Sequence, residues 1–172
     1  MNHATLMQPE RLYPGFKYHV EHIRRGRVID EEEVSNLVPL EGLNYMLNVS
    51  YRGLAQSSVW SLGLYSGNYT PTSSVLASTL NAVANELLTY DAATRLLFTT
   101  VAATTGSLSN VGAPAEFIST LDALVYGGFM STASAKGSGT GLLGSVVRFA
   151  TAKQFNVGDT LRMTGGLTLI ST

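Results

Sequence analysis

The sequence contains no cysteine, so it can form no disulfide and offers neither a thiolate nucleophile nor a sulfur ligand for a metal. It also lacks any long apolar run, and its first residues are too polar for a signal peptide, so we expect a protein that is not secreted and has no membrane segment. The formal net charge of -1 argues against binding nucleic acid through bulk electrostatics. A chain of 172 residues is expected to form one domain with its own core.

Charge is scarce over most of the chain. Of the 23 acidic and basic residues, 13 lie in residues 1–52 and 10 in residues 53–172. The later part therefore carries about 8% charged residues, against about a quarter in typical proteins. Two interpretations stay open: Ser, Thr, Asn and Gly coat this part of the surface, or other subunits cover much of it.

Residues 36–71 predict one helix followed by one strand. The helix is expected at about residues 41–52, because Glu41 suits a first turn and Gly53 suits the position after the last turn. Its apolar stripe follows helical spacing through Leu43, Met46, Leu47, Ser50 and Leu54. The period then changes to two, which predicts a half-buried strand with this set on one face: Trp60, Leu62 and Leu64.

The N-terminal part is expected to form an arm and a hairpin. Residues 1–15 contain two prolines and little periodicity, which predicts an extended arm. Alternation from Phe16 onward and the Arg25-Gly26 turn predict a charged hairpin over residues 16–35. Four acidic residues, 30–33, follow the arginines directly, so a solvated or subunit-facing hairpin is favoured over a nucleic-acid site.

The remaining residues, 58–172, are expected to form a β body. Residues 70–88 leave helix and loop open, and their Ser, Thr and Asn content favours a long loop with at most a short helical turn. Residues 104–110 predict a turn, and strands are expected at residues 95–101, 115–120, 123–130, 145–150 and 160–170. Gly127-Gly128 indicates a bulge or a close backbone approach.

These elements together predict the fold class. We expect a mainly β protein, an antiparallel β-sandwich or jelly-roll-like domain over residues 16–172, with one short helix and the extended N-terminal arm. No alternation of strands with long helices favours a parallel sheet.

No motif for catalysis, cofactor binding or metal binding is found. His19 and His22 fall on opposite faces of the expected strand, so they cannot share a metal through local spacing. The carboxylates near predicted strand ends are each isolated: Asp91, Glu116, Asp122 and Asp159. We therefore expect no enzyme activity, no cofactor and no metal.

One aromatic group is compatible with a sugar-binding face, although aromatic strand residues more often belong to a core or an interface. The group consists of Trp60, Tyr65 and Tyr69.

The order of longer motifs carries a resemblance to a known family. These motifs are NLVPLEGLNYMLNVSYRG, VWSLGLYSGNYTPT, ELLTYDAATRLLF, GSLSNVGAPAEFIST, VYGGFMSTASAKGS and VVRFATAKQFNVGDTLRMTGGLTL. Over residues 36–169 the chain resembles structural proteins of tailed bacteriophages that are similar to the cement, or head-decoration, proteins of podophage capsids. The resemblance implies a jelly-roll-like domain that docks outside a capsid of the tailed-phage major-capsid fold, bridges its subunits and stabilises the shell.

The resemblance also implies partners and a location. The partners are the major capsid protein and further copies of this chain, as a homodimer or homotrimer at local symmetry axes, with neither nucleic acid nor membrane. The location is the capsid exterior of the virion, after synthesis in the host cytoplasm. Candidate partner-binding residues in the arm and hairpin are Leu6, Tyr13, Phe16, Arg24, Arg25 and Arg27.

Two other functions stay open at this point. One is a structural component of a tail or baseplate. The other is a glycan-binding or hydrolytic jelly-roll module, which for hydrolysis requires several carboxylates to converge in one groove.

Overall fold

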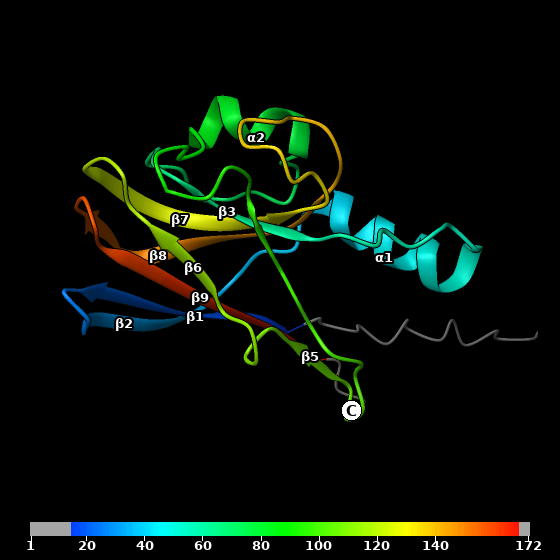
Figure 1. Ribbon diagram of the computed structural model, residues 1–172. Coiled ribbons are helices and arrows are strands. Elements are labelled where there is room, and N and C mark those ends of the chain that lie inside the picture. The colour runs from blue at the N-terminus through cyan, green and yellow to red at the C-terminus, as the bar shows by residue number, and fades with distance from the viewer. Residues whose placement is uncertain (1–14, 169–172) are drawn as a thin grey trace, which may run out of the picture.

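Two antiparallel sheets packed face to face form the body of the molecule (Figure 1). The computed structural model describes residues 15–168, which form nine strands and two helices. In sheet A the strand order is β2-β1-β9-β5, with β6 also paired to β9, and in sheet B it is β4-β3-β7-β8. The strands are β1 (Gly15–Arg24), β2 (Arg27–Ser35), β3 (Ser61–Tyr65), β4 (Leu96–Leu97), β5 (Ser107–Ser109), β6 (Ala115–Ile118), β7 (Ala123–Ser131), β8 (Leu143–Phe155) and β9 (Thr160–Thr168). The expected antiparallel β-sandwich with a short helix is confirmed.

The main core lies between the two sheets and is built from alternate residues of their strands. Sheet A contributes Phe16, Tyr18, Val20, Phe117, Leu161 and Met163. Sheet B contributes Leu62, Leu64, Val125, Val147, Phe149 and Phe155. The Tyr18 hydroxyl lies 2.6 Å from Ser145 Oγ, so the polar tip of this buried ring has a partner. Burial raises the pKa of Tyr18, which keeps the phenol neutral in the core.

The predicted hairpin is present as β1 and β2. Arg25 and Gly26 have φ angles of 51° and 73°, the two positive values that a tight two-residue turn between antiparallel strands requires. On its other side β1 pairs with β9 from Gly15 to Ile23. The hairpin is therefore part of sheet A rather than a separate appendage.

Helix α1 (Leu40–Arg52) starts one residue before the predicted range and ends where predicted, with Gly53 in the left-handed region at φ 71°. Glu41 does more than complement the first turn, because its Oε2 accepts hydrogen bonds from the backbone N–H of Ala77 (3.0 Å) and Leu143 (2.7 Å). A Cβ at Gly42 would lie 2.9 Å from the Leu143 carbonyl oxygen, so the helix backbone approaches β8 closely. The N-terminal end of α1 is thereby fixed to sheet B.

The apolar stripe of α1 is only partly packed on the sandwich: Leu43 and Met46 are half-buried and Leu47 is exposed. The only buried residues of the helix are Gly42 and Tyr45. Leu47 is 57% exposed and Tyr51 is 83% exposed. The helix projects from one end of the sandwich, with most of its length beyond the sheets (Figure 1).

The prediction of a long loop at residues 70–88 was wrong, because this segment contains helix α2 (Ala77–Ala84). Its first turn is stabilised by the Thr79 hydroxyl, whose oxygen accepts a hydrogen bond from the Leu76 backbone N–H. The buried face consists of Ala77, Leu80 and Ala84, which pack against the outer face of sheet B. The polar residues that favoured a loop lie on the opposite, exposed face of this short helix.

The half-buried character predicted for the Trp60 strand was also wrong. All five residues of β3 are buried, because one face of sheet B packs in the sandwich core and the other packs under α2. Tyr65 belongs to this second cluster and donates a hydrogen bond from its hydroxyl to the Val147 carbonyl oxygen at 2.9 Å. Trp60 lies just before β3 and remains partly exposed.

Several predicted strand boundaries differ from the observed ones. The predicted turn at residues 104–110 contains β5, which pairs with β9. Strand β4 is only two residues long, because Arg95 is held by a buried ion pair and not by backbone pairing with a neighbouring strand. Strand β8 is 13 residues long, far beyond the predicted 145–150, since its polar residue Lys153 is buried with acidic partners. Strand β9 is described to Thr168, so residues 169 and 170 of the predicted strand lie outside the described part.

Gly127 occupies a position that no other residue fits, as its predicted close approach implied. The register of the β7–β8 pair shifts between Val125 and Gly127. A Cβ on Gly127 would lie 2.1 Å from the Val147 carbonyl oxygen and 2.3 Å from the Tyr65 hydroxyl. Both the bulge and the close approach are therefore present.

We expect Gly127→Ala to lower the free energy of unfolding by about 2 kcal/mol, because the methyl group would push apart two buried strands. Gly112→Ala is the matched control, since a Cβ there meets nothing within 4 Å. Urea unfolding of both variants measures the difference. An unchanged midpoint for Gly127→Ala would contradict the steric argument.

Candidate functional site

A fully buried ion pair fixes the loop that follows β7. Arg95 donates to Glu86 through Nε (2.8 Å) and Nη2 (2.7 Å), and both side chains are almost completely buried. Arg95 also donates to the carbonyl oxygens of Ala133 and Ser138, and the Gly137 N–H donates to Glu86. Every strong donor in this cluster points at a protein acceptor, so its role is to hold residues 132–142 against sheet B.

A second buried cation links the two sheets. Lys153 of β8 contacts Asp30 and Glu32 of β2, with 2.9 Å between its Nζ and Glu32 Oε1. Burial alone would lower the pKa of Lys153, but the hydrogen bonds to these two carboxylates outweigh it and the pKa rises. The acidic run that follows the arginines in the sequence thus partly serves an internal contact rather than the solvent.

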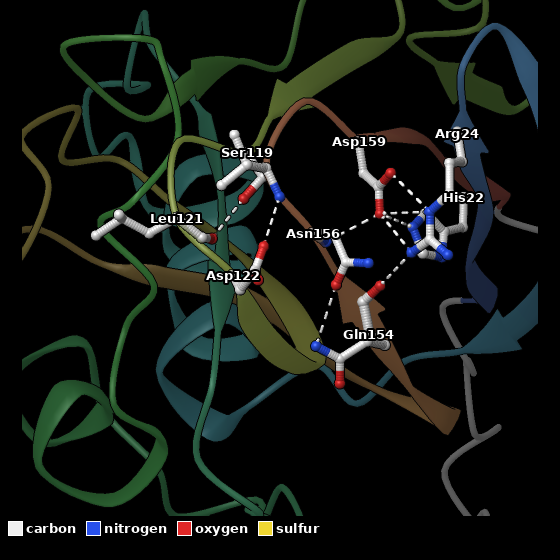
Figure 2. Close-up of polar contacts among 9 residues, drawn as sticks. His22, Arg24, Ser119, Leu121, Asp122, Gln154, Asn156 and Asp159 are labelled. Atoms are coloured by element: carbon white, nitrogen blue, oxygen red, sulfur yellow. Dashed lines mark hydrogen bonds and ion pairs between the residues drawn. The ribbon is translucent and has the colours of Figure 1, made fainter.

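Asp159 stands at the centre of a polar network at the hairpin end of the sandwich (Figure 2). Its carboxylate accepts from Arg24 Nη2 at 2.7 Å, lies 2.9 Å from His22 Nε2 and accepts from the Asn156 N–H at 2.9 Å. The hydrogen bonds from Arg24 lower the pKa of Asp159 well below its usual range, against the opposing effect of burial. The network ties β1 to the turn between β8 and β9.

The predicted partner-binding residues that the structure describes do not form one surface. Leu6 and Tyr13, like the arm apart from Gly15, lie outside the described residues. Phe16 is buried at the start of β1, and Arg24 is engaged with Asp159. Arg25 and Arg27 are exposed at the hairpin tip and, within residues 15–168, form no ion pair. Because β1 has ten residues, the Phe16 end and the arginine end are separated by roughly 30 Å.

A large open groove lies at the Phe16 end of the sandwich. Its volume is about 1040 Å³. Helix α1 contributes the half-buried Leu43 and Met46 and the exposed Leu47 and Tyr51 to its lining. The rest of the chain contributes further apolar residues, among them Phe16, Trp60, Phe98, Leu108 and Leu167.

The groove differs from an ordinary polar surface in its lining. Its lining residues include no charged side chain, and most are apolar or aromatic. Its polar lining residues are Ser, Thr and Gln56. Several apolar residues around it are strongly exposed, among them Leu47, Tyr51 and Leu97. A surface of this kind is typical of a site for a protein segment, because it offers apolar area and few directional contacts.

The sequence patterns did not predict this groove, although they predicted two of its components. The apolar stripe of α1 and the neighbouring Trp60 were both recognised from their spacing. The other side comes from the ends of β1 and β9 and from residues 97–100, which are distant in the sequence. The signal for a groove that the sequence did contain was an amphipathic helix beside an uncharged segment with little periodicity.

The remaining candidate residues are dispersed. Tyr65 is buried under α2, on the face of sheet B opposite to the core that Trp60 contacts, so the two aromatics share no sugar-binding face. Glu116 pairs with Arg162, and Asp122 accepts from the Val157 N–H. The isolated carboxylates do not converge in the groove, whose lining contains none.

A three-residue group on the hairpin was not anticipated. Ligand atoms of His19, Glu21 and Glu31 lie within 4.8 Å of one another, because Glu31 stands opposite Glu21 in the hairpin register. The Glu21 carboxylate already accepts a hydrogen bond from Arg162 at 3.0 Å. His22 lies on the other face and is buried, as the alternation of β1 predicted.

No known protein family, characterised protein or solved structure matches this chain in the comparisons. Neither helix of residues 15–168 has the length and apolar character needed to cross a membrane.

We expect Asp159→Asn to lower the free energy of unfolding at pH 7 by about 2 kcal/mol, because His22 and Arg24 lose a charged acceptor. The pKa of Asp159 is lowered in the folded state, so its contribution is complete above the ordinary value of 3.8 and is lost as the pH falls through the folded-state pKa. The difference between wild type and variant should therefore shrink in acid. Denaturant unfolding over a pH series measures it, and Asp91→Asn, at an exposed carboxylate, is the control. A difference that stays constant into strong acid would contradict this assignment.

Proposed function

We propose that this protein is a viral structural protein, a cement or head-decoration protein that binds the outside of a tailed-phage capsid and stabilises the shell. The observation that carries the proposal is the open, uncharged groove on a rigid β-sandwich whose buried charges are paired internally. Such a body is suited to bind another protein surface rather than to transform a small molecule. The motif resemblance of residues 36–169 supplies the class of partner.

The arrangement of the two candidate surfaces supports a bridging role. The groove lies where β1 begins, and Arg25 and Arg27 lie where β1 ends. A molecule with an apolar surface at one end and a cationic tip at the other can contact two neighbouring subunits at once. Many such weak contacts, repeated over a shell, stabilise the assembled lattice because the protein binds the lattice and not its free subunits.

The scarcity of charge supports coverage by other subunits. Of the ten charged residues after residue 52, six form ion pairs within the chain: Glu86, Arg95, Glu116, Lys153, Asp159 and Arg162. Four of these six, Glu86, Arg95, Lys153 and Asp159, are buried, so the charge that remains for the surface of the β body is lower than its sequence composition implies. A surface with so little charge is suited to contacts with the capsid and with further copies of this chain.

The decisive experiment is co-sedimentation of the purified protein with expanded capsid shells that lack it, alongside unexpanded shells. We expect saturable binding to expanded shells, and loss of that binding when residues 1–14 are removed, because the arm belongs to the contact surface. The truncation leaves β1 intact, which circular dichroism verifies. Absence of binding to both shells would contradict the proposal and favour a tail or baseplate component. Retained binding by the truncated chain would contradict the role of the arm.

The hairpin tip can be tested separately. We expect the double variant Arg25→Ala/Arg27→Ala to bind expanded shells about fivefold more weakly, because two exposed charges at an interface contribute modestly. The variant Arg25→Lys/Arg27→Lys keeps both charges and serves as the matched control. Binding isotherms at low and moderate salt measure the effect, and identical affinities for the two variants would exclude a charge contact at this tip.

A further inference from the structure

We propose that the groove beside α1 binds the chain's own N-terminal segment, residues 1–14. The proposal concerns the free protein; on a capsid the segment would leave the groove, so that both the groove and the segment become available for the contact proposed above. It rests on where the described chain begins, on the length of the segment, and on the match between its chemistry and that of the groove.

The described chain begins at the groove. Phe16, the second residue of β1, lies in the groove lining together with α1 residues such as Leu43 and Met46. The arrow of β1 points away from α1, so the first residue of the strand lies on the side from which α1 projects (Figure 1). The described part of the chain therefore begins beside the groove.

The segment is long enough to follow the whole helix. Fourteen extended residues span up to roughly 46–50 Å, whereas a 13-residue helix is roughly 20 Å long. The segment can therefore run along α1 with length to spare, even if it enters the groove at an angle.

The chemistry of the segment matches the lining. Residues 1–14 include five large apolar or aromatic residues, Met1, Leu6, Met7, Leu12 and Tyr13, and only two with charged side chains, Glu10 and Arg11. The groove has no charged residue that would need a partner, and its α1 wall exposes Leu47 and Tyr51. Covering these side chains with the apolar residues of the segment removes both sets from water.

As the occupant of the groove, the chain's own N-terminal segment has an advantage over a second copy of the protein. It is covalently attached beside the site, so its effective concentration is about millimolar, which is far above the concentration of a dilute second copy. We therefore assign the groove to the chain's own segment.

Arg11 provides a direct test, because trypsin cleaves after it only where the segment is accessible. Leu47→Glu puts a charge in the groove at a half-exposed position, and the variant is expected to fold. The matched control is Val83→Glu, which changes a similarly exposed residue on α2 outside the groove lining. Mass spectrometry of the released fragment, residues 1–11, gives the cleavage rate.

We expect slow cleavage in the wild type and the Val83→Glu control, and cleavage about tenfold faster in Leu47→Glu, because the rate follows the population of released segment. Equal rates in the two variants would overturn the proposal. The measurement is repeated at two widely separated protein concentrations. Protection that is lost on dilution would also overturn it, by assigning the groove to a second copy.

Trp60, the only tryptophan, supplies a second readout. It lines the groove, so removal of residues 1–14 should shift its emission to the red and increase quenching by acrylamide. Unchanged quenching in a truncated chain with an unchanged circular dichroism spectrum would overturn the proposal. None of these measurements uses capsid shells, so their outcome is distinguishable from failure of the proposed function.

Discussion

The burial of sheet B on both faces is the constraint on which the rest of the structure depends. One face of β3 and β7 closes the sandwich core, and the other closes the cluster under α2. Burial on both faces makes an unpaired charge costly, so the ions beside the sheet are matched inside the protein, although the Ser61 hydroxyl of β3 is buried without a partner. Glu41 illustrates the same demand, since one carboxylate satisfies the backbone of both α2 and β8 and thereby fixes the start of α1. The groove follows from this arrangement, because α1 is attached firmly at one end and its apolar stripe extends past the sheets.

Sequence patterns predicted the elements that are stabilised by interactions between residues close in the sequence. The helix near residues 41–52 has a suitable first turn and a glycine after its last turn, and the Arg25-Gly26 turn has the positive φ angles that a tight hairpin needs. Helix α2 and β5 were missed because their cause is tertiary: α2 exists by packing alanines against sheet B, and β5 by pairing with β9. The candidate site was accessible only in part, since its two sides come from segments that meet only in the folded chain.

The distribution of charge explains how a chain with few ions keeps a unique fold. Lys153 and Asp159 each connect elements that are distant in sequence, and each has partners with matching geometry. An alternative register of β8 or of the hairpin would leave such a group buried without its partner, which costs more than the contact itself provides. The buried ion pairs thus select the correct register of the strands, while the apolar clusters supply most of the stability. A body fixed in this way can transmit force between its two ends without changing shape, which suits the bridging role proposed for it.

Strand β9 has a consequence for synthesis. It pairs with β1, β5 and β6, so sheet A has one common partner, and that partner is translated after every other described strand. Until it leaves the ribosome, β1 has only its hairpin neighbour, and β5 and β6 have no partner in sheet A. The sandwich can therefore close only after β9 has emerged, through contacts of long sequence separation that form slowly. A chain interrupted before β9 would display unpaired strand edges, the kind of surface by which nascent proteins aggregate.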